Sequence, residues 1–541
     1  MMRGYEMLLN YIWITLGFLV LGIGMMIYDK RKMNTRIKGL WDKKAVFKVQ
    51  KGEYIRYDGY YNNIRNKDEG IDDITWNDLN METVFRQINY NFTTVGEEYL
   101  YAALRNVGML PKVNRELIER IRTDRTFRED ISVALADLGK NANSDPSQFI
   151  FKDIRRNHYN KIYILMSLMP FISLFLFSAS VTAGMTALVI SIGFNMIQNF
   201  TFTSKNEAQY SELFYAVQLI RSADHLSKVS PFFRIKQGRL RNVEFLSYFI
   251  LNDKQNDQNF FLQLLNALKS VFNLDYHLYH YAVSVMHRNH DTYEACFHTI
   301  GLHDLSYATA LWRETLAYYT EPQAGETLRI EEGYHPLLKE FVANDLTVDK
   351  NIILTGSNAS GKSTFMKTLA LNIVLAKGLH TATAERFSMS PGELYTSMNL
   401  EDSIMEGDSY FISEIKSLKR ILQHIDRPVY IFIDEILRGT NTKERVASAE
   451  AILCHLNDND NVTLITATHD IELTSMLKDE FDFYYFSETL TENNDVTFDY
   501  KLKKGITKTS NAIELMRIYD YPDEVYSKAQ ESVRQLKEWH K

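Results

Sequence analysis

The stretch GSNASGKST, residues 356–364, decides the fold of the C-terminal part of this chain. It fits the pattern G-x-x-x-x-G-K-[ST], in which backbone N–H groups of a glycine-rich loop surround phosphate oxygens. The β-forming residues 351–355 precede the loop, and a helical pattern begins at Phe365. Lys362 is expected to bind the β- and γ-phosphates, and Ser363 is expected to bind Mg²⁺ through its hydroxyl. The loop residues predicted to contact the nucleotide are Gly356, Ser357, Asn358, Ala359, Ser360, Gly361, Lys362, Ser363 and Thr364.

Two further strand patterns supply the rest of the predicted site. Residues 429–433 form an apolar run typical of a buried parallel strand, and Asp434 and Glu435 follow it. Carboxylates in that position lie at the sheet edge where ligands bind. We expect Asp434 to hold Mg²⁺ through water and Glu435 to act as general base on the attacking water. The strand pattern 462–467 ends just before His469, which is placed to sense the γ-phosphate. The predicted catalytic residues are therefore Glu435, Lys362 and His469.

Composition indicates a multidomain protein without a global affinity for polyanions. The chain has 541 residues, of which 45% are hydrophobic and 13% aromatic, and its formal net charge is −7. This charge argues against a surface that is basic overall, as is typical of nucleic-acid binders, although basic residues can still gather locally. Cys296 and Cys454 have no His or Cys partner at ligand spacing. They indicate buried thiols in a reducing compartment rather than a disulfide or a zinc site.

An apolar segment near the N-terminus, residues 11–28, carries no charge and as a helix matches about one membrane thickness. A cleaved signal peptide is the alternative, but the apolar core is long and no small-x-small cleavage pattern follows it. We favour an uncleaved anchor. Basic residues from Lys30 to Lys51 place the following chain in the cytoplasm by the positive-inside rule. The same residues suit anionic lipid headgroups or DNA phosphates, or form a solvated linker.

A second apolar region, residues 162–197, fits two membrane helices joined by a tight outer turn. Pro170 is expected to kink the first helix. Basic residues lie on both sides, from Lys152 to Lys161 and at Lys205, so both ends are predicted to face the cytoplasm. The alternative is a buried helical hairpin in a large soluble core. We predict a multi-pass protein of the cell inner membrane with a cytoplasmic nucleotide site.

Beyond these motifs, residues 351–472 resemble the ATPase domain of the MutS family, mismatch-repair ATPases related to ABC-type ATPases. The resemblance extends to details that a phosphate-binding loop alone does not require. They are Tyr334-His335-Pro336 followed by Phe341-Val342-Ala343-Asn344, Asn358 in the loop, the signature-like segment 402–411, the acid pair with its D-loop at 434–442, the histidine region 467–474, and the tail 508–525.

This resemblance implies further site residues and an assembly. It implies that Phe341 stacks on adenine and that Ser409 reaches a nucleotide bound by the second subunit of a homodimer. Residues 74–104 resemble, more weakly, the start of the family's helical lever domain. The chain leaves no room for the family's mismatch-recognition domain. The triplet Phe127-Arg128-Glu129 spells the family's mismatch-probing F-x-E motif, but we interpret it as coincidence because it lies in a charged helical run.

The expected fold class is an α/β P-loop ABC-type ATPase domain, preceded by an all-α lever-like region with transmembrane helices. The predicted domains are an N-terminal transmembrane anchor (1–30), a basic linker (31–71), a lever-like region (72–158), a transmembrane hairpin (159–200), a second lever-like region (201–325) and the ATPase domain (326–541).

Three functional classes follow from the sequence and the resemblance. The first is a membrane-anchored MutS-like ATPase that hydrolyses ATP with Mg²⁺ at a homodimer interface, coupled to binding of mismatched or branched double-stranded DNA. The second is an ATP-driven mechanical or signalling module at the membrane that binds no DNA. The third, an ABC transporter, is disfavoured because segment 402–411 lacks an LSGGQ-type pattern and three spans are few for a pathway. Protein partners are open.

Overall fold

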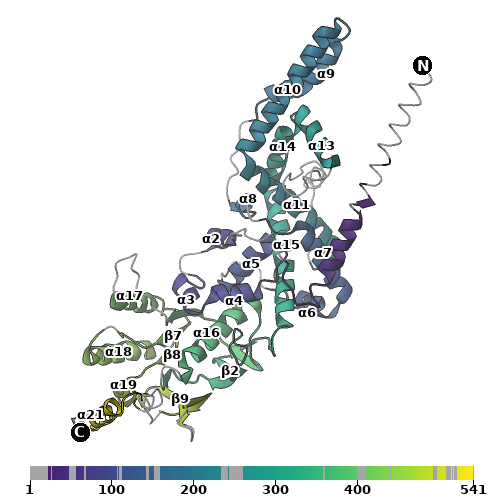
Figure 1. The fold of residues 1–541 in the computed structure, drawn as a ribbon. Coiled ribbons are helices and arrows are strands. Elements are labelled where there is room, and N and C mark those ends of the chain that lie inside the picture. The colour runs from purple at the N-terminus through teal and green to yellow at the C-terminus, as the bar shows by residue number, and fades with distance from the viewer. Residues whose placement is uncertain are drawn as a thin grey trace. The chain divides into compact units, whose positions relative to one another are not determined.

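The computed structural model divides into two compact units (Figure 1). The helical unit comprises Met1–Ile64, Ile88–Ala102 and Pro111–Thr315, and the sheet unit comprises Arg65–Gln87, Ala103–Leu110 and Leu316–Lys541. The predicted anchor at residues 11–28 lies mostly outside the described residues. The structure describes residues 17, 22, 24–25, 27–47, 57–65, 69–106, 108, 113–141, 145–151, 159–232, 242, 260–356, 360–398, 410–438, 440–490, 496–506, 513, 516 and 521–539.

The helical unit confirms the predicted N-terminal helical region. Its helices are α2 (Gly59–Ile64), most of α5 (Thr94–Leu104), α6 (Arg115–Thr123), α7 (Arg125–Leu138), α8 (Gln148–Phe151), α9 (Ile162–Leu176), α10 (Val181–Lys205), α11 (Glu207–Val229), α13 (Phe260–Val271), α14 (Leu274–Arg288) and α15 (His290–Arg313). Helices α7, α11 and α15 pack on one another. Phe127 is buried in α7, and the guanidinium of Arg120 covers its ring at 4.3 Å. Phe127 is therefore part of the helical core, as expected for a coincidental F-x-E match.

The turn that begins α5 is fixed by a buried carboxylate on α15. Asp304 accepts hydrogen bonds from the N–H groups of Phe92 (2.9 Å) and Thr93 (2.8 Å), and from the Thr93 hydroxyl (2.6 Å). Burial raises the pKa of Asp304 to about 6, although these donors oppose the shift. A Cβ at Gly96 would lie 2.0 Å from the Asp304 carboxylate, so only glycine allows this approach. Close packing against Asp304 thus explains the glycine at position 96.

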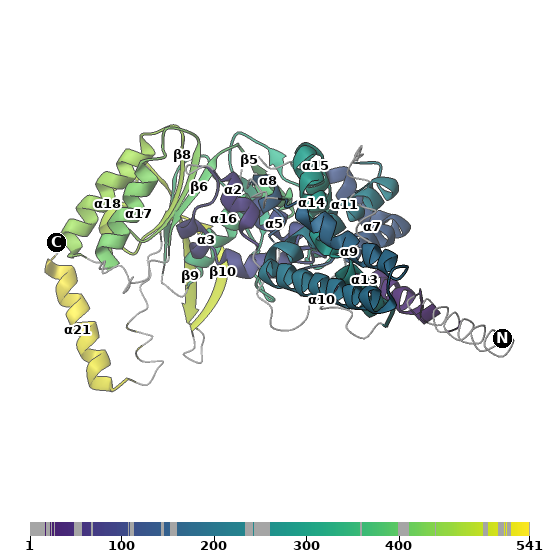
Figure 2. The same ribbon diagram turned by 90° about the horizontal axis from the view of Figure 1, so that it is seen from above.

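Helices α9 and α10 form an antiparallel hairpin within the helical unit (Figure 1, Figure 2). Among the described residues, α10 is the one helix long and apolar enough to cross a membrane. Helix α9 has 15 residues, which is fewer than the ~20 that a spanning helix needs. Of the two helices predicted to span the membrane, only α10 is therefore long enough. The buried-hairpin alternative is wrong, because only 17% of the apolar window of α10 is buried.

The sheet unit is built around a six-stranded sheet of order β10-β9-β4-β8-β7-β6. Neighbouring strands are parallel except β10, which runs antiparallel to β9. The strands of this sheet are β4 (Ile352–Thr355), β6 (Glu393–Ser397), β7 (Val429–Asp434), β8 (Val462–Ala467), β9 (Asp482–Leu490) and β10 (Val496–Lys504). A second sheet has the order β1-β5-β2-β3, with β1 (Gln323–Ala324), β2 (Arg329–Gly333), β3 (Asn344–Thr347) and β5 (Arg386–Met389).

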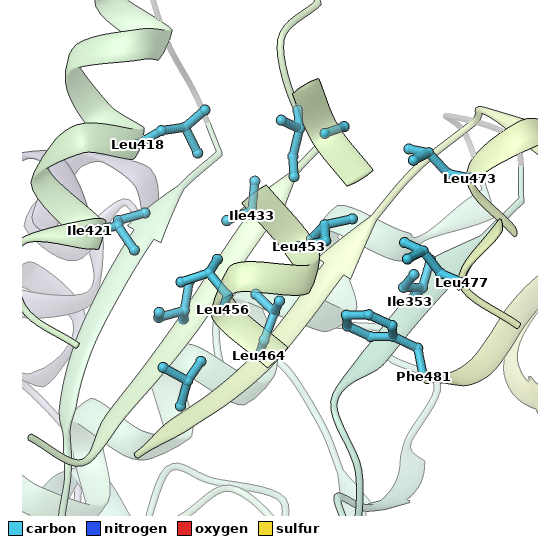
Figure 3. Packing of buried hydrophobic residues seen from close by; sticks show 14 of the residues in the cluster. Ile353, Leu418, Ile421, Ile433, Leu453, Leu456, Leu464, Leu473, Leu477 and Phe481 are labelled. Atoms are coloured by element: carbon cyan, nitrogen blue, oxygen red, sulfur yellow. The ribbon is translucent and has the colours of Figure 1, made fainter. Parts of the chain in front are cut away.

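Helices cover the large sheet and create its core. They are α16 (Lys362–Leu379), α17 (Tyr410–Leu422), α18 (Thr442–Asn457) and α19 (Ile471–Met476), with α3 (Asp73–Asp78), α4 (Met81–Ile88) and α21 (Asp523–Trp539) elsewhere in the unit. Figure 3 shows Leu418 of α17 and Leu453 of α18 among strand residues such as Leu464. Each fully buried side chain of this kind contributes about 1.5–3 kcal/mol. This core holds the strands in the register that brings the candidate site residues to one edge of the sheet.

A short arm from the N-terminal region belongs to the sheet unit. Helix α3 lies against β6, whose outer edge has no strand partner among the described residues. Thr396 donates its N–H to the Thr75 hydroxyl (3.2 Å) and its own hydroxyl to Asp78 (2.6 Å). The N–H of Met398 also donates to Asp78, at 3.0 Å. The arm therefore satisfies donors that the edge strand would otherwise expose.

Candidate nucleotide-binding site

Three strand ends meet at one edge of the large sheet. Strand β8 lies between β4 and β7, and Ala467 of β8 pairs with both Leu354 and Asp434. All three strands are parallel, so the segments that follow them leave the sheet at the same edge. These segments are the glycine-rich loop, the acid pair and the residues around His469. The sheet thus brings together what the sequence placed on three separate strands.

The two glycines of the loop after β4 have positive φ angles. Gly356 and Gly361 have φ values of 130° and 104°, a region that favours glycine. A Cβ at Gly356 would also lie 2.8 Å from a carbonyl oxygen of Phe486. Ser360 is buried beside them, and Gly361 begins α16, whose first turn contains Lys362, Ser363 and Thr364. The predicted contacts Ser357, Asn358 and Ala359 lie outside the described residues.

Lys362 is buried, and its ammonium group is held inside the site. Its Nζ donates to the carbonyl oxygen of Gly356 at 2.6 Å. The same nitrogen lies 3.3 Å from Nε2 of His469. The ammonium group is therefore held next to Gly356, at the start of the loop that the sequence predicts to bind phosphate.

Ser363 and Asp434 form the part of the site that suits a divalent cation. The Ser363 hydroxyl donates to Oδ2 of Asp434, and Asp434 is 8% exposed. A hydroxyl and a carboxylate in contact offer the hard oxygen donors that Mg²⁺ prefers. The residues present therefore fit Mg²⁺.

Glu435 is held between two positively polarised groups. Its Oε1 lies 2.8 Å from Nε2 of His469, and its Oε2 lies 2.7 Å from Nε of Arg438. Burial favours a higher pKa for Glu435, but the hydrogen bond from His469 and the charge of Arg438 outweigh it. The pKa of Glu435 is lowered as a result, and the carboxyl stays ionised. With a proton on Nε2 directed at Glu435, the contact of His469 with Lys362 is not a second hydrogen bond.

The backbone around Glu435 is strained. Glu435 and Leu437 both have a φ of 59°, in the left-handed region that non-glycine residues rarely adopt. The N–H of Leu437 is held by Glu414 of α17 at 2.6 Å, and the N–H of Glu435 donates to the carbonyl of Ala467 at 3.0 Å. These two hydrogen bonds hold the strained backbone on either side of Ile436 in place.

Of the two remaining predicted site residues, the structure describes Phe341 alone. Phe341 stacks on Tyr334, with ring centroids 4.1 Å apart. It precedes β3, where Asn344 binds the carbonyl of Tyr500 at 2.9 Å. Ser409 lies outside the described residues.

Two residues next to the site were not predicted from the sequence. The ring of Tyr500, on β10, is so close to the loop that a Cβ at Gly361 would lie 3.1 Å from its Cδ1. Arg438, which holds Glu435, was also missed. Nothing in the alternating pattern of β10 distinguishes Tyr500 from other strand aromatics. The basic residue three positions after the acid pair was a readable signal for Arg438.

Residues 352–537 match MutS domain V. The matched range contains the glycine-rich loop, the acid pair and His469. The MutS resemblance that the sequence motifs indicated is thus supported for the C-terminal part of the chain.

Curated MutS proteins are similar over a longer stretch. DNA mismatch repair protein MutS of Fusobacterium nucleatum is 28% identical over 344 residues, which cover 61% of this chain and 37% of that protein. MutS protein homolog 4 of Mus musculus is 34% identical over 223 residues, 38% of this chain and 23% of that protein. DNA mismatch repair protein MutS 2 of Halobacterium salinarum is 32% identical over 226 residues, 39% and 26% respectively. The chain therefore matches well under half the length of these relatives.

Proposed function

We propose that this protein is a Mg²⁺-dependent ATP hydrolase of the MutS type that works as a homodimer at a membrane. The observation that carries the proposal is the meeting of Lys362, the Ser363–Asp434 pair and Glu435 at one sheet edge, in the part of the chain that matches MutS domain V. A buried cation, a cation-binding oxygen pair and an ionised base are the parts that phosphoryl transfer requires.

Nucleotide binding begins with an exchange of partners at Lys362. Its ammonium group leaves the carbonyl of Gly356 and takes phosphate oxygens instead, while the N–H groups of the loop and of the first turn of α16 bind the remaining oxygens. Mg²⁺, held by Ser363 and by Asp434 through water, would neutralise charge on the β- and γ-phosphates. Phe341 supplies an aromatic face for the adenine, as the MutS resemblance implies.

Hydrolysis then needs a base in line with the γ-phosphate. Glu435 accepts a proton from the attacking water as the water oxygen bonds to the γ-phosphorus and the bond to the bridging oxygen breaks. The two contacts that hold Glu435 ionised, to His469 and Arg438, also occupy its oxygens. Turnover therefore requires His469 to move from Glu435 toward the γ-phosphate, which gives this histidine its sensing role.

Dimerisation couples ATP binding and hydrolysis to movement of the helical units. Ser409 of each subunit completes the nucleotide site of its partner, so ATP favours a closed dimer and hydrolysis releases it. Closure of the sheet units acts on the helical units, because the chain passes between the two units through α4 and α5. The dimer drives this movement next to a membrane, with both sheet units in the cytoplasm.

Duplex DNA is the partner that similarity to mismatch-repair proteins suggests. The alternative is an ATP-driven mechanical or signalling module that binds no DNA. A salt titration of duplex binding, with ATP turnover measured in the same samples, separates the two. Binding that weakens steeply with salt, together with turnover stimulated by mismatched or branched duplex, supports DNA coupling. Absence of binding at low salt leaves the alternative.

The ATPase proposal is tested with the purified full chain in lipid nanodiscs. Lys362→Ala should abolish nucleotide binding, and Glu435→Gln should bind ATP, hold the closed dimer and turn over about 10²–10⁴-fold more slowly. Lys478→Ala and Glu480→Gln change the same residue types at exposed positions and should behave like the parent. Normal turnover by Glu435→Gln would remove the general-base assignment, and binding by Lys362→Ala would remove the phosphate site.

A further inference from the structure

The α9–α10 hairpin presents an uncharged apolar surface to its surroundings. Residues 162–204 contain no acidic, basic or histidine residue. Large apolar side chains on both helices are exposed, for example Phe175 (78%), Val181 (67%) and Phe200 (73%). Such a continuous surface is costly in water and matches the hydrocarbon of a lipid bilayer.

A carbonyl freed inside the hairpin is satisfied without water. Pro170 has no N–H, so the carbonyl of Met166 one turn earlier has no helical donor. The side-chain amide of Asn195, on α10, donates to this carbonyl at 3.0 Å, and Asn195 is 1% exposed. An unpaired carbonyl would be solvated in water but costs several kcal/mol in hydrocarbon. Asn195 also donates to the carbonyl of Val271 at 2.9 Å, so this pairing lies where α13 covers the hairpin and leaves no polar group there that needs water.

The polar groups of the turn between α9 and α10 are likewise hydrogen-bonded within the hairpin. The N–H groups of Ser178, Ala179 and Ser180 donate to carbonyls in the last turn of α9. The Ser178 hydroxyl donates to the carbonyl of Phe175 at 2.7 Å, and the Ser180 hydroxyl pairs with that of Thr182 at 2.9 Å. No charged side chain marks this turn as a loop that emerges into water. Its polar groups are instead arranged as a dry environment requires.

The free length of the hairpin is too short for a crossing. Helix α9 has 15 residues, which is about 22 Å, against a hydrocarbon thickness of about 30 Å. Helix α9 is also covered by the connection between α13 and α14, where the ring of Phe272 stacks on that of Phe171 with centroids 4.9 Å apart. The same region contains the buried ion pair of Lys269 and Asp275 (3.0 Å), which marks protein interior rather than lipid. Only the outer part of the hairpin is free to enter hydrocarbon.

We propose that the α9–α10 hairpin inserts into the bilayer from the side of the sheet unit and ends within the hydrocarbon, without crossing. The inference rests on the membrane attachment in the proposed function and refines it. The hairpin then acts as a wedge in one side of the bilayer, and both of its ends stay on the side where ATP is bound.

Cysteine accessibility in the full chain tests this topology. In a Cys454→Ser background, where the remaining Cys296 is fully buried, Ala179→Cys labels the turn and Ser204→Cys labels the exposed foot of α10. Sealed inside-out vesicles and spheroplasts are treated with a charged, membrane-impermeant maleimide, with and without detergent. Ser204→Cys should react in inside-out vesicles. Ala179→Cys should react in neither preparation until detergent is added.

Two outcomes overturn the inference and differ in what they say about the membrane. Labelling of Ala179→Cys in spheroplasts would mean that the hairpin crosses, and membrane attachment would stand. Labelling of Ala179→Cys in inside-out vesicles without detergent would mean that the hairpin lies in water. In that case, extraction of the protein by alkaline carbonate would also remove the membrane from the proposed function, whereas retention would assign attachment to another segment.

Discussion

Removal of the Asp78 carboxylate should loosen the edge of the sheet that carries the site. In Asp78→Ala, the Thr396 hydroxyl and the Met398 N–H lose their acceptor in a buried place, since Asp78 is 1% and Thr396 0% exposed. A hydrogen bond to a charged group contributes about 1.5–3 kcal/mol, so the two bonds sum to ~3–6 kcal/mol. The variant also avoids the cost of burying a carboxylate, which favours the lower end of this range.

Hydrogen–deuterium exchange reports this loss locally in the full chain. A loss of about 3 kcal/mol corresponds to ~100-fold faster exchange at the amides of Thr396 and Met398. Asp78→Asn retains an acceptor for the Met398 N–H and should fall between the parent and Asp78→Ala. Asn77→Ala, at an exposed position of the same helix, is the matched control. If Asp78→Ala exchanges like Asn77→Ala, the contact between α3 and β6 does not stabilise the strand edge and the reasoning is refuted.

Three further changes test other parts of the molecule. Arg438→Gln removes a charge that lowers the pKa of Glu435. Because a general base must be ionised, the acid limb of the pH profile of ATP turnover should move to higher pH. An acid limb that does not move would contradict the ion pair between Arg438 and Glu435. Asn195→Ala leaves the carbonyl freed by the helix proline unpaired, and should cost about 1–2 kcal/mol in denaturation in lipid, while no change would indicate that water reaches it. Gly378→Ala would place a Cβ 2.4 Å from the carbonyl oxygen of Ala103, and should lower the thermal midpoint of the sheet unit by several degrees in calorimetry. An unchanged midpoint would mean that the backbone at Ala103 can shift freely.

The sequence alone determined the local parts of the candidate nucleotide site. The loop, the acid pair and His469 follow strand patterns whose period and apolar content are set within a few residues, and their parallel order follows from the strand–loop–helix context. Left-handed glycines were readable for the same reason, because Gly356 and Gly361 satisfy a backbone need that belongs to the loop itself. The apolar hairpin was also readable, since charge-free composition does not depend on neighbours.

Only the tertiary structure decided which distant segments meet. That Arg438 and His469 hold Glu435 from two sides depends on the adjacency of β7 and β8 and on a left-handed backbone at a non-glycine residue, which no local pattern reports. Residues 65–87 belong to the sheet unit, where the carboxylate of Asp78 accepts a hydrogen bond from the hydroxyl of Thr396, 318 positions away. Such contacts are fixed by packing after the chain has folded, so the sequence supplied the groups and the fold supplied their partners.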